Sequence, residues 1–423
     1  MTIAAAPVEL IAAPETAYWT RARKAGAVYV VIGLLVVLFW GILAKTGGDS
    51  RFTLAQSYSG KSLPIPSRAG TIAFGLITAA AGGALLSGRL NRRFNLLSTI
   101  AVIGIVLSFL CWQVAGNVMP LGSTAQLSVV AALPLVFGAL SGVLCERSGV
   151  INVAIEGQFL TGAFLGALVA TITNSVWIGL IGAILGGVLI AWLLAVLAIH
   201  YLVDQVVLGV LLNLLAAGLT AFLYGQLMQT NAAGFNSPGL LPVWSIPGLS
   251  RIPILGPALF QGTLLLYLAI VLIPAVHIGL FHTRWGLRTR AVGEHPTAAD
   301  TVGIKVLSVR YRNVLMGGVL AGLGGAYFTL GSTGPFGKNM TVGNGFIALA
   351  ALIFGRWSPV GATLAALLFG FTGQVGNYLG TILSPIPSQF LNMLPYAVTI
   401  LAVAGFVGKV RAPAADGKPY TKG

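Results

Sequence analysis

The chain has 423 residues, of which 57% are hydrophobic and only 8% are charged. A soluble globular domain carries about 25% charged residues, so this composition all but excludes a soluble protein and indicates one that lies largely in a membrane. The formal net charge of +15 does not indicate a nucleic-acid partner, because the Lys and Arg residues stand at the ends of hydrophobic runs, where lipid headgroups attract them.

Hydrophobic runs follow one another along the chain, and about 20 apolar residues cross a bilayer as a helix. We therefore expect an all-α, polytopic membrane protein with roughly 10–12 transmembrane helices. The expected spans are 25–44, 69–87, 96–115, 128–144, 152–172, 177–199, 205–228, 262–282, 312–331, 344–355, 360–382 and 391–408. The run at 344–355 is too short to cross alone, so we expect a half-helix or a re-entrant segment there.

The basic residues predict the orientation of these spans. The first span follows Arg21, Arg23 and Lys24, and no small-residue cleavage pattern comes after it, which favours an uncleaved helix over a signal peptide. With that end inside, the loops on the same side hold most of the Lys and Arg residues. Both termini are therefore expected to face the cytoplasm. The proline-rich loop at 229–261 is expected outside, as a cap for an extracellular partner or as a passive connector.

One dense polar segment, RWGLRTRAVGEHPTAADTVGIKV at 284–306, interrupts the hydrophobic pattern. Pro296 suits the first position of a helix, and Gly303 suits its left-handed end. The short helix between them would present a small apolar face, made of Ala298, Ala299 and Val302. Because so short a helix does not persist alone, we expect it to pack against another surface. The alternative is an ordinary cytoplasmic loop rich in positive charge.

Glu156 is the most deeply placed acid in the expected spans. An ionisable group inside a membrane is costly and is a functional candidate for that reason. It lies in the segment 146–158, where Gly149 and Gly157 would permit a break or a close helix crossing. Two readings stay open: Glu156 lines a translocation path, or it is the centre of a buried hydrogen-bond network.

Amide side chains inside the other spans extend this polar set. In membranes such amides more often bridge helices than bind ligands. Together with Glu156 they describe a neutral, polar route that suits uncharged polar substrates better than ions. The residues predicted to line this route are Asn152, Glu156, Gln158, Asn213, Asn344, Gln374 and Asn377.

Signals of chemistry are absent from the sequence. The histidines have no metal-ligand spacing and no Ser/His/Asp arrangement is visible, so we expect no catalytic residue and no metal site. Gly60-Lys61-Ser62 ends like a phosphate-binding loop, but Ala55 stands where that pattern needs a glycine. The chain is therefore not expected to be an enzyme or to bind a cofactor itself.

Four segments resemble a known family. These are ERSGVINVAIEGQFLTGAF (146–164), the polar segment 284–306, IALAALIFGRWSPVGATLAALLFGF (347–371) and FLNMLPYAVTILAV (390–403). They resemble inner-membrane permeases of bacterial ATP-binding-cassette (ABC) importers, in the branch that serves nucleosides, simple sugars and branched-chain amino acids. The later segments are most similar to nucleoside-type permeases. The resemblance covers about residues 128–408.

The resemblance implies a bacterial inner-membrane importer built from several chains. It implies a second permease chain, homologous or identical, surrounded by membrane lipid. Two ATPase subunits would bind ATP and magnesium, and an extracellular lipoprotein would deliver the substrate. The polar segment would be the coupling segment that receives the ATPase. Its expected contact residues are Gly286, Arg290, Gly293, Glu294, Pro296, Ala298, Ala299, Asp300 and Gly303.

These inferences divide the chain into four parts. They are a cytoplasmic N-terminal segment (1–24), additional N-terminal spans (25–127), a permease core (128–408) with the coupling segment at 283–310, and a cytoplasmic tail (409–423). The predicted function is the permease subunit of an ATP-driven nucleoside importer. Alternatives are a sugar importer of the same type, an ion-coupled secondary transporter that relies on Glu156, and an integral-membrane transferase.

Overall fold

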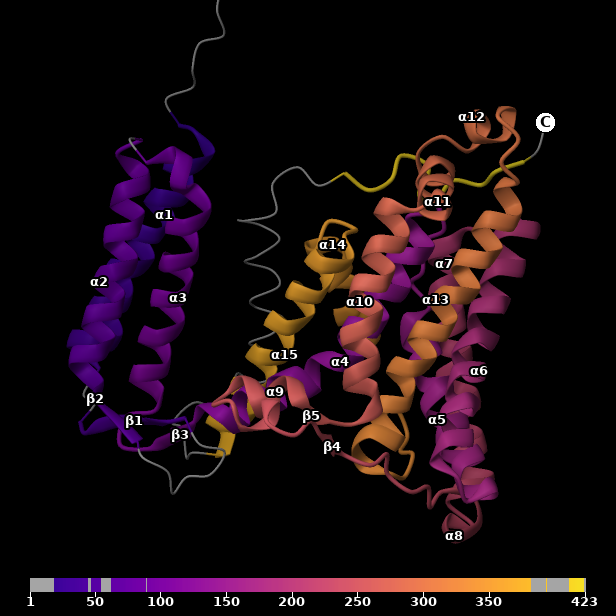
Figure 1. The fold of residues 1–423 in the computed structure, drawn as a ribbon, viewed down its shortest axis with the longest axis horizontal. Coiled ribbons are helices and arrows are strands. Elements are labelled where there is room, and N and C mark those ends of the chain that lie inside the picture. Colours follow the sequence, from indigo (N-terminus) through magenta and orange to yellow (C-terminus); the bar gives the residue numbers. More distant parts are fainter. Residues whose placement is uncertain are drawn as a thin grey trace, which may run out of the picture. The chain divides into compact units, whose positions relative to one another are not determined.

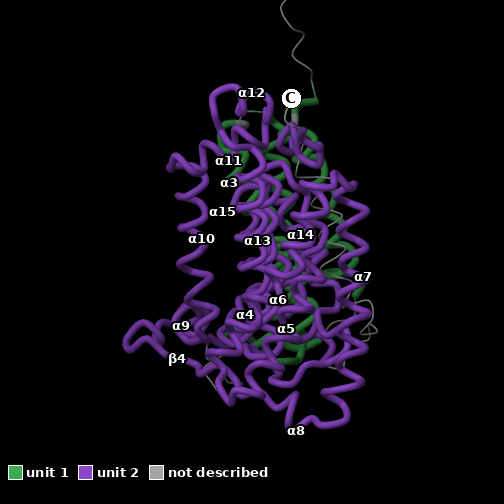
Figure 2. Tube along the Cα trace, turned by 90° about the vertical axis from the view of Figure 1, so that its right-hand side faces the viewer, with its two compact units in different colours: residues 1–52, 62–119 green, residues 53–61, 120–423 purple. Residues whose placement is uncertain are grey.

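The computed structural model describes residues 19–44, 47–54, 62–88, 90–381, 393 and 411–421. The chain forms two compact units (Figure 2). Unit 1 comprises Met1–Phe52 and Ser62–Met119, and unit 2 comprises Thr53–Lys61 and Pro120–Gly423.

Unit 1 is a three-helix bundle with a small sheet at one end. Its helices are α1 (Arg21–Val36, continued by a π-helical stretch Val37–Leu43), α2 (Ser67–Leu86) and α3 (Phe94–Gln113). Its strands are β1 (Asp49–Thr53), β2 (Ser62–Pro66) and β3 (Val118–Pro120), in the order β2-β1-β3. The sheet was not expected, because the sequence at 45–68 carries little structural signal.

Glycines bring α1 and α2 into backbone contact. A side-chain carbon added at Gly26 would lie 2.7 Å from the carbonyl oxygen of Gly82, and one at Gly33 would lie 2.8 Å from that of Gly75. Membrane helices associate largely through such close packing, because lipid tails are as apolar as the side chains and the hydrophobic effect does not drive helices together. Tyr29 is buried beside this crossing.

Unit 2 is a bundle of longer helices with short elements at its two ends (Figure 1). The long helices are α4 (Leu121–Glu146), α5 (Ile155–Thr173), α6 (Val176–Ala195), α7 (Gln205–Leu223), α10 (Leu264–His282), α13 (Val306–Phe328) and α15 (Pro359–Thr381). The short helices are α8 (Ala232–Phe235), α9 (Leu255–Phe260), α11 (Arg284–Glu294), α12 (Pro296–Thr301) and α14 (Asn344–Phe354). A two-stranded sheet pairs β4 (Trp244–Ser245) with β5 (Gln261–Gly262).

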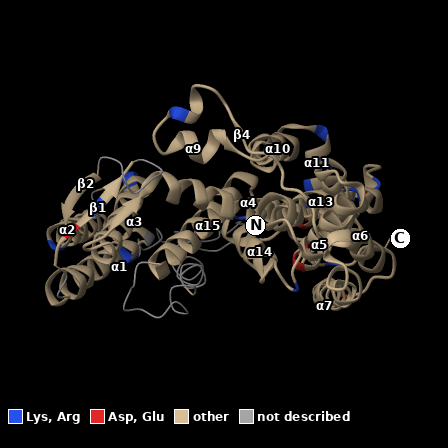
Figure 3. Ribbon diagram, turned by 90° about the horizontal axis from the view of Figure 1, so that it is seen from below, with Lys and Arg blue, Asp and Glu red and all other residues tan. Residues whose placement is uncertain are grey.

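The two ends of unit 2 carry different elements. Helices α11 and α12 lie at one end, whereas α8, α9 and the β4–β5 pair lie at the other (Figures 1 and 2). The expected ordered cap at 229–261 therefore has its own short helices and strands. Charged residues are sparse along the helices (Figure 3), as expected for segments that face lipid or one another.

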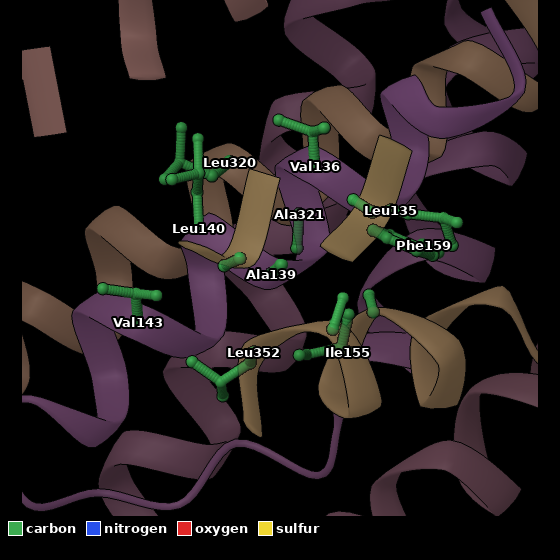
Figure 4. Close-up of a cluster of buried hydrophobic side chains, with 14 of the residues drawn as sticks. Leu135, Val136, Ala139, Leu140, Val143, Ile155, Phe159, Leu320, Ala321 and Leu352 are labelled. Atoms are coloured by element: carbon green, nitrogen blue, oxygen red, sulfur yellow. The ribbon is translucent and has the colours of Figure 1, made fainter. Parts of the chain in front are cut away.

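Helix α13 is central to the packing of unit 2, because it contacts α4, α5 and α6. Figure 4 shows the resulting apolar core, in which Leu140 of α4, Ile155 of α5, Ala321 of α13 and Leu352 of α14 are buried within one cluster. Phe159 is fully buried in the same cluster. Helix α14 is thus held by the centre of the bundle although it is short.

Within the described residues, ten helices are long and apolar enough to cross a membrane. They correspond to ten of the twelve expected spans, and the protein is therefore an all-α, multi-pass membrane protein. The expected short segment at 344–355 is α14, whose 11 residues extend about 16 Å, roughly half of a hydrocarbon core. The expected span at 391–408 lies outside the described residues, apart from Met393.

The crossing of α6 and α13 gives a test of this packing. A side-chain carbon at Gly322 would lie 2.6 Å from the carbonyl oxygen of Ala183 and 2.7 Å from Cα of Ile184. Because the backbone cannot yield easily there, Gly322→Val should lower the stability of the folded protein by about 1–3 kcal/mol or more. The measurement is thermal unfolding in detergent. Gly218→Val is the matched control, since nothing lies within 4 Å of that position; equal melting temperatures for the two variants would contradict the packing.

Candidate coupling segment and polar core

The polar segment folds as two helices, of which only the second was predicted. In α12, Pro296 occupies the first turn, and Gly303 just beyond the helix has a φ of +83°. The preceding α11 is capped by Thr283, the residue before its first, whose hydroxyl accepts a hydrogen bond from the backbone N–H of Gly286 at 3.2 Å. A threonine in this position satisfies one of the free N–H groups at a helix start.

The predicted apolar face of α12 is divided between two sides. Ala299 is 3% exposed and packs with Val292 and Val306, whereas Val302 is 75% exposed and Ala298 is also exposed. Neighbouring residues in a helix point in different directions, so a helix this short cannot bury all three. Ala299 therefore attaches α12 to the protein, and Ala298 and Val302 face outward.

The other predicted coupling residues lie around this junction. A side-chain carbon at Gly286 would overlap the carbonyl oxygens of the last turns of α10, and one at Gly293 would overlap the carbonyl of Arg147. The guanidinium of Arg290 lies 5.2 Å from the ring centre of Phe281. The absence of side chains at both glycines lets α11 rest directly on the ends of α10 and α4.

Glu156 lies in the first turn of α5 and binds the start of α14. Its Oε1 accepts hydrogen bonds from Thr341 Oγ1 at 2.6 Å and from the N–H of Gly343 at 2.8 Å. Its Oε2 accepts one from the N–H of Gly345 at 2.6 Å. A carboxylate at a helix N-terminus is favoured by the helix dipole as well as by these donors.

The backbone that leads into α14 is irregular and needs these contacts. Asn339 and Val342 have positive φ angles of 51° and 45°, and Gly343 has one of 76°. Such a conformation is costly for a β-branched residue such as valine and is kept only where the surroundings impose it. The carboxylate of Glu156 supplies that constraint from another helix.

The predicted amides separate into two groups. Asn152 and Gln158 are fully buried and bond to each other, with Asn152 Nδ2 also donating to Ser141 Oγ at 3.2 Å. Asn213 of α7 accepts from the N–H of Gly157 at 2.8 Å and donates to the carbonyl of Val153 at 2.9 Å. These three amides hold the start of α5 in place.

The remaining amides are more open. Asn344 is partly exposed and donates to the carbonyl of Thr341 at 2.7 Å, in the turn that Glu156 also binds. Gln374 is partly exposed and Asn377 is exposed, both on α15. The structure thus brings Asn344 close to Glu156, and places the last two residues on a separate helix.

Sequence reasoning missed a second junction, at the end of α4. The carboxylate of Glu146 accepts a hydrogen bond from Trp357 Nε1, and Arg147 Nε donates to the carbonyl of Trp357 at 2.8 Å. Arg356 and Trp357, which join α14 to α15, have positive φ angles of 58° and 53°. The end of α4 therefore fixes the far end of α14, just as Glu156 fixes its start.

The described part of the tail, residues 411–421, also packs on this region. The backbone N–H of Ala415 donates to the carbonyl of Gly293 at 2.9 Å, and the carboxyl of Asp416 meets that of Glu146. Burial raises the pKa of Asp416 to about 7. Two carboxyl groups can form a hydrogen bond only when one of them holds a proton. Burial is the cause of the raised pKa of Asp416, and the hydrogen bond with Glu146 acts in the opposite direction. No sequence signal marked the tail as an ordered element.

Residues 124–403 match the family model described as the permease component of branched-chain amino acid transport systems. This range is well over half of the chain and lies wholly within unit 2. The bundle therefore belongs to a membrane permease, and the chain is a member of this permease family.

Several relatives define the branch more closely. The nucleoside ABC transporter permease protein NupC of Lactococcus lactis subsp. cremoris (strain MG1363) is 40% identical over 303 residues, which cover 70% of this chain and 95% of the relative. The guanosine ABC transporter permease protein NupQ of Bacillus subtilis (strain 168) is 41% identical over 307 residues, with the same coverage. The putative glucose ABC transporter permease protein TsgC13 of Haloferax volcanii is 37% identical over 236 residues, covering 55% of this chain and 70% of the relative. No solved structure matches the chain.

The contacts of Glu156 give a local prediction. In Glu156→Gln, one oxygen is replaced by an amide that faces N–H donors, and the charge at the α14 N-terminus is lost. Hydrogen bonds to a charged group contribute about 1.5–3 kcal/mol. Their loss should raise the equilibrium constant for local opening at the start of α14 by the factor that this free energy corresponds to. Hydrogen exchange at the amides of 343–347 measures this opening.

A matched control is available on α7. Asp204 accepts hydrogen bonds from the N–H groups of Val206 and Val207 at 3.0 and 2.9 Å. Asp204→Asn should speed exchange at the start of α7 and leave 343–347 unchanged. Unaltered exchange at 343–347 in Glu156→Gln would show that the carboxylate does not hold α14.

Proposed function

We propose that this chain is the permease subunit of an ATP-driven importer of nucleosides. The observation that carries the proposal is the identity of about two residues in five with two nucleoside-type permeases over 95% of their length. The glucose-type relative matches a shorter part of both chains, so a sugar substrate is the second candidate. Specificity would also depend on a binding lipoprotein that delivers the substrate on the outer side.

The polar core supports an uncharged substrate. Both carboxylate oxygens of Glu156 accept hydrogen bonds from protein groups, so this acid is engaged in structure rather than presented as a free charge. In the proposed route, Asn152, Gln158 and Asn213 stabilise the start of α5, which carries Glu156. The more open amides of Asn344, Gln374 and Asn377 would face the substrate. An ion-coupled mechanism would need Glu156 to be free to bind and release a cation.

The proposed assembly is the one that membership of this permease family implies, and the coupling segment supports it. A second permease chain would complete the core. Two ATPase subunits, which bind ATP and magnesium, would dock on the exposed sides of the two α12 helices, one on each permease chain. Binding of ATP would favour one of two arrangements of the permease, because it stabilises the ATPase contacts of that arrangement. In this assembly the protein lies in the bacterial cytoplasmic membrane, with α11, α12 and both termini on the cytoplasmic side.

The function is tested by uptake in a cell that lacks its own nucleoside importers. Expression of the complete system should give uptake of a radiolabelled nucleoside and none of labelled glucose. An inactive ATPase subunit should abolish uptake, whereas a protonophore should leave most of it in ATP-supplied membrane vesicles. Uptake of glucose alone would favour the sugar importer. Nucleoside uptake that persists without the ATPase and collapses with the protonophore would favour the ion-coupled transporter.

The docking role of α12 is tested by two neighbouring substitutions. Ala298→Asp adds a charge to the exposed side of the helix, where the ATPase subunit would dock. It should therefore reduce uptake at least about tenfold, a factor within the usual range of coupling between sites. The protein should still reach the membrane. Ala299→Asp places a charge in the buried side and should instead lower the amount of folded protein. The readouts are uptake, ATPase activity of the complex and the amount of chain in the membrane.

Ser87→Asp is the control for added charge, since Ser87 is exposed at the end of α2 and outside the coupling segment. It should behave like the unaltered protein. Normal uptake and normal ATPase activity in Ala298→Asp would contradict the docking role.

A further inference from the structure

Residues 414–420, near the end of the described tail, run across the coupling segment and are bonded to it. The backbone N–H of Ala415 donates to the carbonyl of Gly293 at 2.9 Å, and that of Ala414 donates to Glu294 Oε2 at 3.2 Å. Gly293 and Glu294 are the last residues of α11. The strap, as we call residues 414–420, is therefore attached to the turn between α11 and α12.

The same strap is attached to the transmembrane helices. Arg310 of α13 is only 1% exposed, and its Nη1 donates to the carbonyl of Lys418 at 3.0 Å. The carboxyl of Asp416 meets that of Glu146 at the end of α4. A single short segment thus joins the coupling helices to both α4 and α13.

The strap also touches the loop between α4 and α5. A side-chain carbon at Gly149 would lie 3.1 Å from the carbonyl oxygen of Ala415, and one at Gly417 would lie 2.7 Å from Cδ1 of Ile151. This loop leads directly to Asn152 and to Glu156, which binds the start of α14. The contact of the strap with Ile151 therefore lies directly before Asn152 and five residues before Glu156.

Tyr420 fixes the end of the strap on α12. Its side chain is 7% exposed and packs with Val292, Ala299 and Val306, and its hydroxyl bonds to Asp300. Ala299 is the residue that attaches α12 to the rest of the protein. A displacement of α12 would therefore move the ring of Tyr420 with it.

We propose that the strap takes part in coupling the ATPase to the transmembrane helices. Tyr420 is a positioning residue that makes α12 and the α4–α5 loop move together. The proposal rests on the proposed function, because it requires an ATPase that acts on α12. Within residues 413–420 the described backbone hydrogen bonds only close turns, from Asp416 to Pro413 and from Lys418 to Ala415. The position of the strap is therefore set by the elements it joins, and it transmits their movement.

The test compares transport with ATP hydrolysis in the complete complex, reconstituted in lipid vesicles. Tyr420→Ala removes the ring that holds the strap on α12. It should lower the amount of nucleoside moved per ATP hydrolysed by about tenfold, within the range of ordinary coupling energies, while ATP hydrolysis continues. Tyr420→Phe keeps the ring and should restore most of the coupling. A chain that ends at Pro413 should behave like Tyr420→Ala.

Tyr201→Ala is the matched control, because Tyr201 is an exposed aromatic residue (65%) just after the α6 segment, and its ring packs on His200 rather than on a residue of the strap. It should leave the transport-to-hydrolysis ratio unchanged. Co-purification of the ATPase subunits with each variant shows that the complex is assembled. An unchanged ratio in Tyr420→Ala, or a loss of both activities in equal proportion, would overturn the proposal. Failure of the unaltered complex to move any nucleoside would instead contradict the proposed function.

Discussion

The carboxylate of Glu156 holds together two helices that a bilayer would otherwise leave poorly bonded. Backbone N–H groups inside a membrane need internal partners, and those of Gly343 and Gly345, at the start of α14, donate to this one side chain. Trp357 and the end of α4 fix the other end of the same short helix. The short helix α14, which packs in the apolar core of unit 2, is therefore bonded at both ends by acidic side chains from neighbouring elements.

This arrangement links the polar core to the coupling segment through a few short connections. Glu146 and Arg147 bind the turn after α14, and the carbonyl of Arg147 lies against Gly293 at the end of α11. The loop that follows Arg147 carries Asn152 and Glu156. A movement of α11 and α12 thus has a continuous path of packed groups to the start of α5. Rigid contacts of this kind switch between discrete packings rather than deforming gradually.

Much of the fold follows from the sequence, because the length of an apolar run is dictated by the bilayer and the stop signals of α12 are local. Helix α11 escaped prediction, since its sequence has two glycines and no apolar run, and its packing on α10 decides its conformation. The role of Glu156 stayed ambiguous because its partners lie 185 to 189 residues away in the chain. The ordered tail was missed for the same reason: Tyr420 is buried against residues of α11, α12 and α13, which lie far from it in the chain.

In the proposed assembly, the exposed side of α12, which carries Ala298 and Val302, receives an ATPase subunit. A photo-crosslinking amino acid placed at Val302, which is 75% exposed, tests this contact most directly in membranes that contain the complete transporter. We expect a crosslink between this chain and the ATPase subunit, with a yield that changes when nucleotide binds, and none from the same probe at Ser87. A probe at Val302 that reaches only lipid, while nucleoside uptake is intact, would contradict it.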